Sequence, residues 1–185
     1  MIRMMKLNQA VALIGLFSVV TVSQAQIVNP SFENGSGVDA ANWFRFGNAY
    51  REPVGARTGN FSMKMFGNFN GGTNVTGAFQ DFAIAPGQTA SASVYGLNMS
   101  TDAMSGDNFA VLKLIYRDAA NNDIAFQESA VRIDRNTTQD QFQLMTASLG
   151  AAPANTDHGS LFLLFVQLET TPFAGGATFF DDAQV

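Results

Sequence analysis

The chain has 185 residues, 46% of them hydrophobic, and a formal net charge of −5 that comes from 15 acidic and 10 basic side chains. An acidic chain repels phosphate, which argues against nucleic acid or anionic lipid as its main partner. The absence of cysteine excludes disulfides and thiolate metal sites, and a single histidine, His158, leaves little room for a zinc site or a Ser-His-Asp triad.

Residues 1–25 have the pattern of a secretory signal peptide. Arg3 and Lys6 precede an apolar stretch that ends in the small-x-small cleavage pattern SQA at 23–25. The stretch is short for a bilayer, which favours cleavage over a retained anchor, and no later stretch is long enough to insert. We therefore expect a secreted or cell-surface chain that begins at Gln26, with a net charge of −7 once Arg3 and Lys6 are lost.

The remaining residues, 26–185, predict a single all-β domain. Short apolar or alternating segments are separated by turns rich in Gly, Asn and Asp, and no stretch keeps a 3.6-residue apolar period for long. This spacing is typical of a jelly-roll β-sandwich of two antiparallel sheets. The predicted strands are residues 60–66, 78–84, 89–99, 109–118, 124–133, 142–149 and 160–169.

Two of these strands indicate how their faces are covered. In the strand 109–118, alternation places Lys113 and Arg117 on one face, which we expect to meet solvent, and Leu112, Leu114 and Tyr116 on the other. The run LFLLFVQL at 161–168 is apolar on both faces. This second strand is expected to be covered on both sides or to lie in an oligomer interface.

The closing segment, ATFFDDAQV, sets two carboxylates into an apolar strand. Alternation groups Asp181 with Ala183 and Val185, which look core-directed, and groups Asp182 with Gln184, which predicts that Asp182 faces solvent. A buried carboxylate needs a cation, a set of hydrogen-bond donors or water. The sequence therefore predicts a special partner for Asp181.

Several segments in order resemble one group of proteins. The expected mature chain opens with IVNPSFENG and NWFRFG, continues with ARTGNFSMKMFG and AFQDFAIAPGQTASASVYG, and closes with ATFFDDAQV. This series resembles the jelly-roll carbohydrate-binding modules of families four, nine and twenty-two, which belong to the galactose-binding-domain-like superfamily. The resemblance covers nearly all of residues 26–185.

The resemblance implies a structural calcium ion. Members of these families often hold the ion between the Glu of the opening motif, here Glu33, and an Asp of the closing motif, here Asp181. Carbonyl oxygens come from a loop that matches residues 59–62, where Asn60 lies. Calcium prefers hard oxygen ligands, of which only a few need be carboxylates. The alternative is that backbone amides cap both carboxylates, or that they are exposed at strand ends.

The resemblance also implies a sugar site with aromatic rings under the sugar and polar side chains at its hydroxyls. The candidates are Gln80, Tyr95, Tyr116 with its neighbour Arg117, and Tyr50 with its neighbour Arg51.

The aromatic composition departs from that family pattern. The chain has 17 Phe against one Trp and three Tyr, and Phe is the aromatic residue that usually fills cores. For Trp43, in NWFRFG, packing is favoured over a role as a sugar platform. Tyr95 and Tyr116 are expected either at the core edge or on the binding face.

The sequence offers little support for catalysis. His158 lies beside Asp157 and near Ser160, but no GxSxG elbow surrounds any serine. The sequence therefore predicts a secreted, non-catalytic glycan-binding module with a structural calcium ion. The alternative is a matrix or cell-surface protein that self-assembles on the same fold without a sugar ligand.

Overall fold

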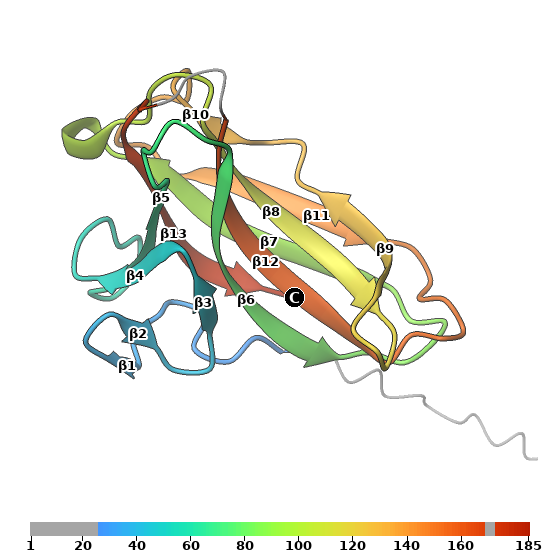
Figure 1. Ribbon diagram of the computed structural model, residues 1–185. Coiled ribbons are helices and arrows are strands. Elements are labelled where there is room, and N and C mark those ends of the chain that lie inside the picture. Colours follow the sequence, from blue (N-terminus) through green and yellow to red (C-terminus); the bar gives the residue numbers. More distant parts are fainter. Residues whose placement is uncertain (1–25, 169–172) are drawn as a thin grey trace, which may run out of the picture.

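The computed structural model describes residues 26–168 and 173–185 (Figure 1). The predicted signal peptide, residues 1–25, lies outside the described residues. Within the described ranges the only helical turn is η1 (Ser100–Asp102), and no helix has the length and hydropathy needed to cross a membrane.

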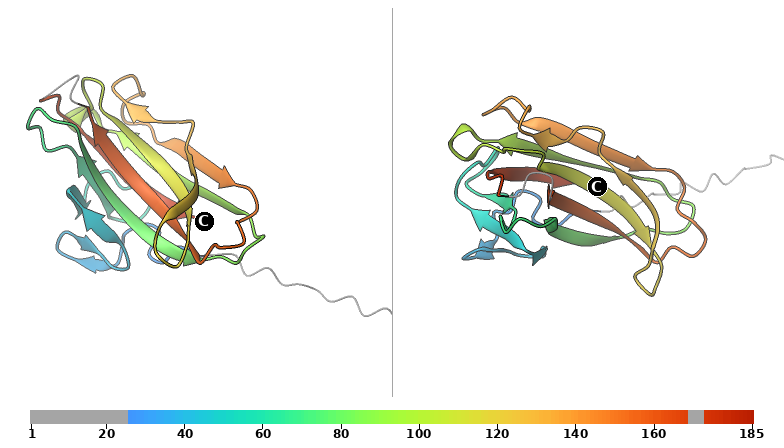
Figure 2. Two further views of the ribbon diagram at one scale, coloured as in Figure 1. Left: turned by 45° about the vertical axis from the view of Figure 1, so that its right-hand side comes forward. Right: turned by 45° about the horizontal axis from the view of Figure 1, so that its top comes forward.

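The fold is an antiparallel β-sandwich, as the sequence predicts. Its strands are β1 (Gly35–Ser36), β2 (Asp39–Ala40), β3 (Phe44–Phe46), β4 (Asn48–Glu52), β5 (Ser62–Phe66), β6 (Asn74–Ala83), β7 (Ala90–Asn98), β8 (Phe109–Arg117), β9 (Asp123–Glu128), β10 (Ile133–Asp134), β11 (Gln143–Leu149), β12 (His158–Gln167) and β13 (Ala177–Gln184). One sheet has the order β10-β8-β12-β6-β3, with β9 also paired to β8. The other has the order β11-β7-β13-β5-β4, and β1 pairs with β2. The two sheets pack face to face (Figure 2).

Strand β12 lies between β6 and β8, which explains its continuous apolar sequence. Its odd-numbered side chains Leu161, Leu163 and Phe165 are fully buried between the sheets. Its even-numbered side chains Phe162 and Leu164 point to the other face and are only half-buried. The second apolar face is therefore partly open rather than fully covered.

Strand β8 follows the predicted alternation. Leu112, Leu114 and Tyr116 are buried in the core, whereas Lys113 and Arg117 lie on the outer face of the sheet and are half-buried. The cations thus lie on the face that points away from the core, but Val111 and Ile115 on the same face are 1% and 2% exposed, so this face meets solvent only in part.

Trp43 has a packing role. It is 6% exposed, its ring centroid lies 5.0 Å from that of Phe32, and its Nε1 donates to the carbonyl oxygen of Asn29 at 3.0 Å. These contacts fix the N-terminal segment against the core, and they leave no free ring face for a sugar platform.

The two ends of the described chain meet. Strand β13 lies between β5 and β7, and the backbone N–H of Ala183 donates to the carbonyl oxygen of Pro30 at 2.9 Å. The amide of Gln80 accepts from the N–H of Val28 at 2.6 Å, and it donates to the carbonyl oxygens of Val28 and Asn42 at 2.9 and 3.0 Å. The N-terminal segment is therefore bonded to both sheets.

Replacing Gln80 with Leu is expected to lower the free energy of unfolding by about 2 kcal/mol or more, because three backbone groups lose their partner beside a buried side chain. The matched control is Gln127→Leu on β9, where the side chain is exposed. Urea unfolding measures both variants. Equal losses in the two variants would contradict a role for Gln80 in holding this segment.

Candidate functional site

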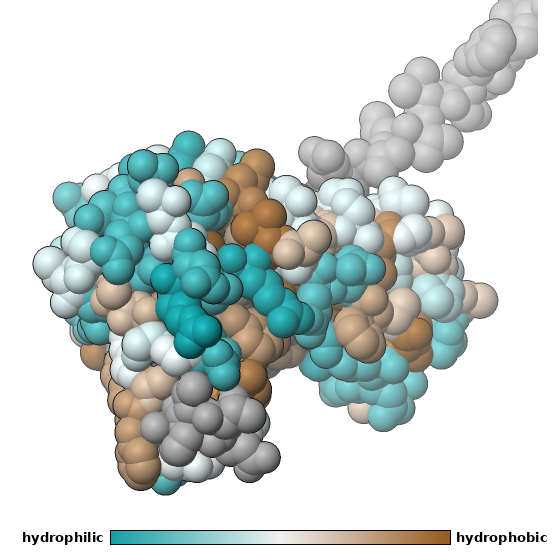
Figure 3. Space-filling model, turned by 90° about the horizontal axis from the view of Figure 1, so that it is seen from above, coloured by the Kyte–Doolittle hydropathy of each residue, from teal (hydrophilic) through white to brown (hydrophobic). Residues whose placement is uncertain are grey.

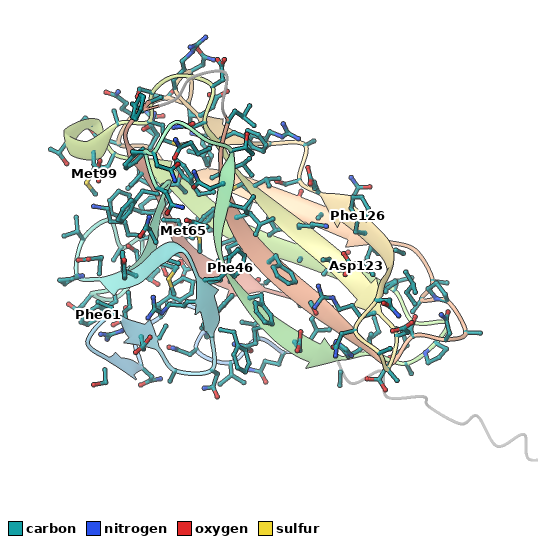
Figure 4. The ribbon with its side chains drawn as sticks, viewed as in Figure 1. Phe46, Phe61, Met65, Met99, Asp123 and Phe126 are labelled. Carbon is teal, nitrogen blue, oxygen red and sulfur yellow. The ribbon has the colours of Figure 1, made fainter. Side chains whose placement is uncertain are left out.

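The outer face of the sheet that contains β12 gathers exposed apolar side chains; we call this surface the six-stranded face. Phe44 and Phe46 on β3, Val75 on β6 and Phe126 on β9 are between 37% and 64% exposed. Figure 4 shows Phe46 near β3 and Phe126 near β9, toward opposite edges of the same sheet. Four inter-strand steps separate β3 from β9, a width of about 19 Å.

Three phenylalanine rings form a ladder across this face. Phe44, Phe79 and Phe162 occupy paired positions on β3, β6 and β12. Their ring centroids are 5.3 Å apart for Phe44 and Phe79 and 4.7 Å apart for Phe79 and Phe162, with interplanar angles of 22° and 13°. Beside the ladder, Phe46 lies over Gly77, where an added Cβ would approach its ring to 2.5 Å. The ladder provides an apolar strip on a solvent-accessible sheet.

Basic side chains continue this strip toward the β9 edge. The Arg117 guanidinium lies 5.0 Å from the ring centroid of Phe162, and Lys113 Nζ lies 4.3 Å from that of Phe126. Both cations are paired with Asp123, at 3.0 Å from Arg117 Nε and at 3.6 Å from Lys113 Nζ. The strip therefore combines aromatic rings with charged hydrogen-bonding groups, in which two cations share one carboxylate.

A pocket of about 280 Å³ lies at the loop end of the same face. Its lining includes Phe109, Arg132, Asp134 and Asn136, and the Arg132 guanidinium lies 4.2 Å from the ring centroid of Phe109. Figure 3 views this end from above, where hydrophilic residues form much of the near surface. The pocket repeats the pairing of an aromatic ring with polar donors and acceptors that the strip shows.

Comparisons with known proteins identify this architecture. No protein family and no curated protein matches the sequence. Among solved structures, TmCBM61 in complex with β-1,4-galactotriose is 15% identical, with 88% of this chain and 97% of that one covered and a TM-score of 0.54. The CBM22-2 xylan-binding domain of Paenibacillus barcinonensis Xyn10C is 15% identical, with 84% and 95% covered and a TM-score of 0.57. The chain has the fold of a carbohydrate-binding module.

This module fold also occurs inside enzymes. The CBM22-1-GH10 modules of Clostridium thermocellum xylanase 10B, complexed with xylohexaose, are 15% identical to this chain with a TM-score of 0.57. The match covers 88% of this chain but only 28% of that one. Identities at this level establish the fold and leave the ligand open.

Two of the predicted sugar-binding residues are buried, which corrects that prediction. Gln80 is 6% exposed, and its amide is bonded to the N-terminal segment. Tyr116 is 1% exposed, and its hydroxyl donates to the carbonyl oxygen of Gly150 at 3.0 Å. Both side chains point between the sheets because side chains alternate along a strand. Of the predicted set, only Arg117 lies on the six-stranded face.

The remaining members of the predicted set belong to the other sheet of the module fold. Tyr50 and Tyr95 are half-buried on its outer face, and the Arg57 guanidinium lies 3.7 Å from the ring centroid of Tyr95. Arg51 is 8% exposed and donates to carbonyl oxygens of the N-terminal segment. The predicted residues are thus divided between two surfaces and the core, and they do not form one site.

The ladder was not predicted from the sequence. Phe44, Phe79 and Phe162 were not among the candidates, because Phe as a residue type usually fills cores. The alternation FQDF at 79–82 contained a signal, since it places Phe79 opposite the buried Gln80 and Phe82. The two-sided apolar run of β12 contained another.

The predicted calcium ligands surround one loop, residues 57–61. Glu33 Oε1 accepts from the backbone N–H groups of Asn60 and Phe61, both at 2.9 Å. Asp181 Oδ2 accepts from those of Arg57 and Thr58, at 2.6 and 2.9 Å. The loop brings both carboxylates into one region, and its amides satisfy part of their acceptor capacity.

Asp181 is fully buried, but not for the reason that alternation suggested. It pairs with Tyr95 and therefore points to the outer face of its sheet, whereas Ala183 belongs to the core. A register shift between Asp181 and Gln184, where Asp182 has a φ of 54°, breaks the alternation. Grouping Asp181 with Ala183 was therefore wrong.

Asp182 is not solvent-facing, which is a second correction. Its carboxylate accepts from the hydroxyls of Ser31 and Thr58 at 2.7 and 2.6 Å, and it forms an ion pair with Arg57 at 2.6 Å. Only 14% of its side chain is exposed. It therefore helps to hold the loop that Asp181 caps.

The two neighbouring carboxyls have pKa values shifted in opposite directions. Burial raises the pKa of Asp181 to about 6, against the opposing effect of three backbone N–H groups. For Asp182, burial also raises the pKa, but hydrogen bonds from Thr58, Ser31 and Arg57 outweigh it, and the net shift is downward. The fold thus favours the protonated form of Asp181 and the ionised form of Asp182.

These shifts predict opposite effects of pH on stability in the presence of a chelator. Because folding raises the pKa of Asp181, this group stabilises the fold at low pH, and that stability is lost as the pH rises from about 4 to about 6. Because folding lowers the pKa of Asp182, its contribution is lost as the pH falls through that lowered value. Urea unfolding from pH 3 to 7 measures both trends.

The variants Asp181→Asn and Asp182→Asn separate the two contributions. The stability of wild type relative to Asp181→Asn should decrease as the pH rises to about 6, and relative to Asp182→Asn it should decrease on acidification. Parallel pH curves for wild type and both variants would contradict the assignment.

Proposed function

We propose that this protein is an exported, non-catalytic glycan-binding module and that the six-stranded face is its binding surface. The ladder of Phe44, Phe79 and Phe162 beside paired polar groups is the observation that carries the proposal. A contiguous exposed apolar patch on a soluble domain typically marks an interaction site. Export rests on the signal-peptide pattern of residues 1–25.

The chemistry of the face suits a neutral sugar chain. The C–H surfaces of a pyranose are apolar and pack on aromatic rings, while its hydroxyls need directional donors and acceptors. Arg117 and Asp123 supply such groups beside Phe162. Asp81 lies on β6, the strand on the other side of β12 from Arg117, and it pairs with Ser160, two residues before Phe162.

The proposal assigns no catalytic role to His158. Its Nδ1 lies 2.9 Å from Asp157 Oδ2, but the hydroxyl of Ser160 donates to Asp81 rather than to the imidazole. A serine nucleophile needs a hydroxyl bonded to its base. This arrangement favours binding without bond cleavage.

Affinity electrophoresis in gels that contain soluble xylan or β-1,4-galactan tests the binding face. The two polysaccharides are chosen because the similar solved structures include modules named for xylan or complexed with galactotriose. We expect retardation of the wild type and about tenfold weaker binding of Phe79→Ala and Phe162→Ala, since each loses a ring at the centre of the strip.

The matched control is Val54→Ala, which removes apolar surface from an exposed loop residue outside the ladder. Its binding should equal that of wild type, and circular dichroism should show that all variants are folded. Wild-type binding by both Phe variants would overturn the assignment of the face. Polymers that form without retention on any glycan would favour the alternative, a self-assembling matrix or cell-surface protein.

The proposal includes a structural calcium ion held by Glu33, Asp181 and Asn60. A carboxylate has about four lone-pair sites. Glu33 accepts two N–H donors and Asp181 accepts three, so each carboxylate keeps at least one lone pair for a cation. The described residues contain no group of three or more His, Cys, Asp or Glu placed to hold a metal, so carbonyl oxygens and water would complete the shell.

Removal of calcium with EGTA is expected to lower the melting temperature, and added calcium should restore it. An ion at about 100 times its dissociation constant stabilises the folded state by about 2.7 kcal/mol. Glu33→Gln should abolish the response, whereas Asp102→Asn, in a surface ion pair with Lys64, should keep it. A melting temperature unchanged by both EGTA and calcium would contradict the calcium site. The backbone N–H donors would then be the only partners of Glu33 and Asp181 at this loop.

A further inference from the structure

Strand β11 is an open edge of the five-stranded sheet. All seven of its residues pair with β7 on one side. In the described part of the chain, no further backbone hydrogen bond is present on its other side. Both views of Figure 2 place β11 at the margin of the molecule. A row of backbone donors and acceptors therefore remains available for another strand.

The sequence of β11, QLMTASL, lacks the features by which edge strands avoid pairing. It contains no charged residue, no proline, no glycine and no bulge. The other edges are protected. Strand β3 has only three residues, β9 carries Asp123 and Glu128 with a register shift, and the N–H of Arg51 on β4 donates to the carbonyl oxygen of Val38. Strand β11 is the exception among the described edges.

The pattern of β11 is complementary to itself. In an antiparallel pair with its axis at Thr146, Leu144 lies opposite Ser148 and Met145 lies opposite Ala147 of the second copy. Met145 and Ala147 are buried on the core side of the sheet in each copy, and Leu144, Thr146 and Ser148 are exposed on the other side. Core sides and solvent sides therefore match across the axis, as a closed two-fold interface requires.

We propose that β11 pairs with β11 of a second copy around a two-fold axis at Thr146, which joins two five-stranded sheets into one continuous sheet. An uncharged edge favours a second copy as the occupant, because two chains of this acidic protein meet there without charged side chains on the pairing strands. Glu128, on the neighbouring edge strand β9, is already paired with Arg132 at 3.2 Å. The glycan face lies on the other sheet, so the pairing does not depend on glycan binding.

Sedimentation equilibrium over a concentration series tests the pairing with charged substitutions of Thr146, the residue at the two-fold axis. Thr146→Lys and Thr146→Glu each place two like charges opposite each other, and at low salt each should raise the dimer dissociation constant about tenfold. An equimolar mixture of the two variants should restore dimers, because opposite charges then meet at the axis.

The matched control is Thr101→Lys, which adds the same charge to an exposed threonine of η1, outside β11 and its partner strand β7. It should dimerise as wild type does, and all variants should keep the wild-type melting temperature within about 2 °C. A wild type that stays monomeric up to about 1 mM overturns the proposal. Variants that dimerise separately, or a mixture that stays monomeric, also overturn it.

Discussion

The buried carboxylate of Asp181 determines how the two ends of this domain meet. It accepts N–H groups from Arg57, Thr58 and Asp182, and the same loop donates to Glu33 in the N-terminal segment. A buried carboxylate without these donors would be strongly destabilising. One loop, residues 57–61, thereby links the opening segment to the closing strand, and Gln80 connects that opening segment to the opposite sheet.

Much of the fold follows from local alternation, and that is why the sequence predicts it. The inner and outer faces of β8 are as expected, because the pleat of a regular strand alternates side chains without reference to the rest of the fold. Alternation fails in β13, where a bulge at Asp182 moves Asp181 to the opposite face from Ala183. Nothing in the letters FFDD indicates that bulge, since it depends on the loop and Ser31 that bind the two carboxylates.

The candidate site was less predictable for a different reason. Whether Phe79 or Tyr116 is exposed depends on which face of the sheet meets the second sheet, and this is a property of the tertiary structure. Residue type did not decide the question: Tyr116, left open between the core edge and a binding face, is buried, and Phe162, in a run apolar on both faces, lies on the outer face. The separation of surfaces is also a tertiary property: the aromatic ladder and the open edge at β11 belong to different sheets, so the two proposed contacts do not share a surface.

The cations that lie over exposed rings have a consequence for the behaviour of the free protein. An exposed row of phenylalanine rings promotes non-specific aggregation. Lys113 and Arg117 lie over the rings of Phe126 and Phe162, and their charged groups are paired with Asp123. Each such contact is worth about 0.5–1 kcal/mol at an exposed site. Phe126 and Phe162 are therefore partly shielded by polar side chains at small cost, whereas Phe44 at the other end of the ladder is 64% exposed. Non-specific adhesion is thus discouraged at one end of the strip, while the other end stays accessible.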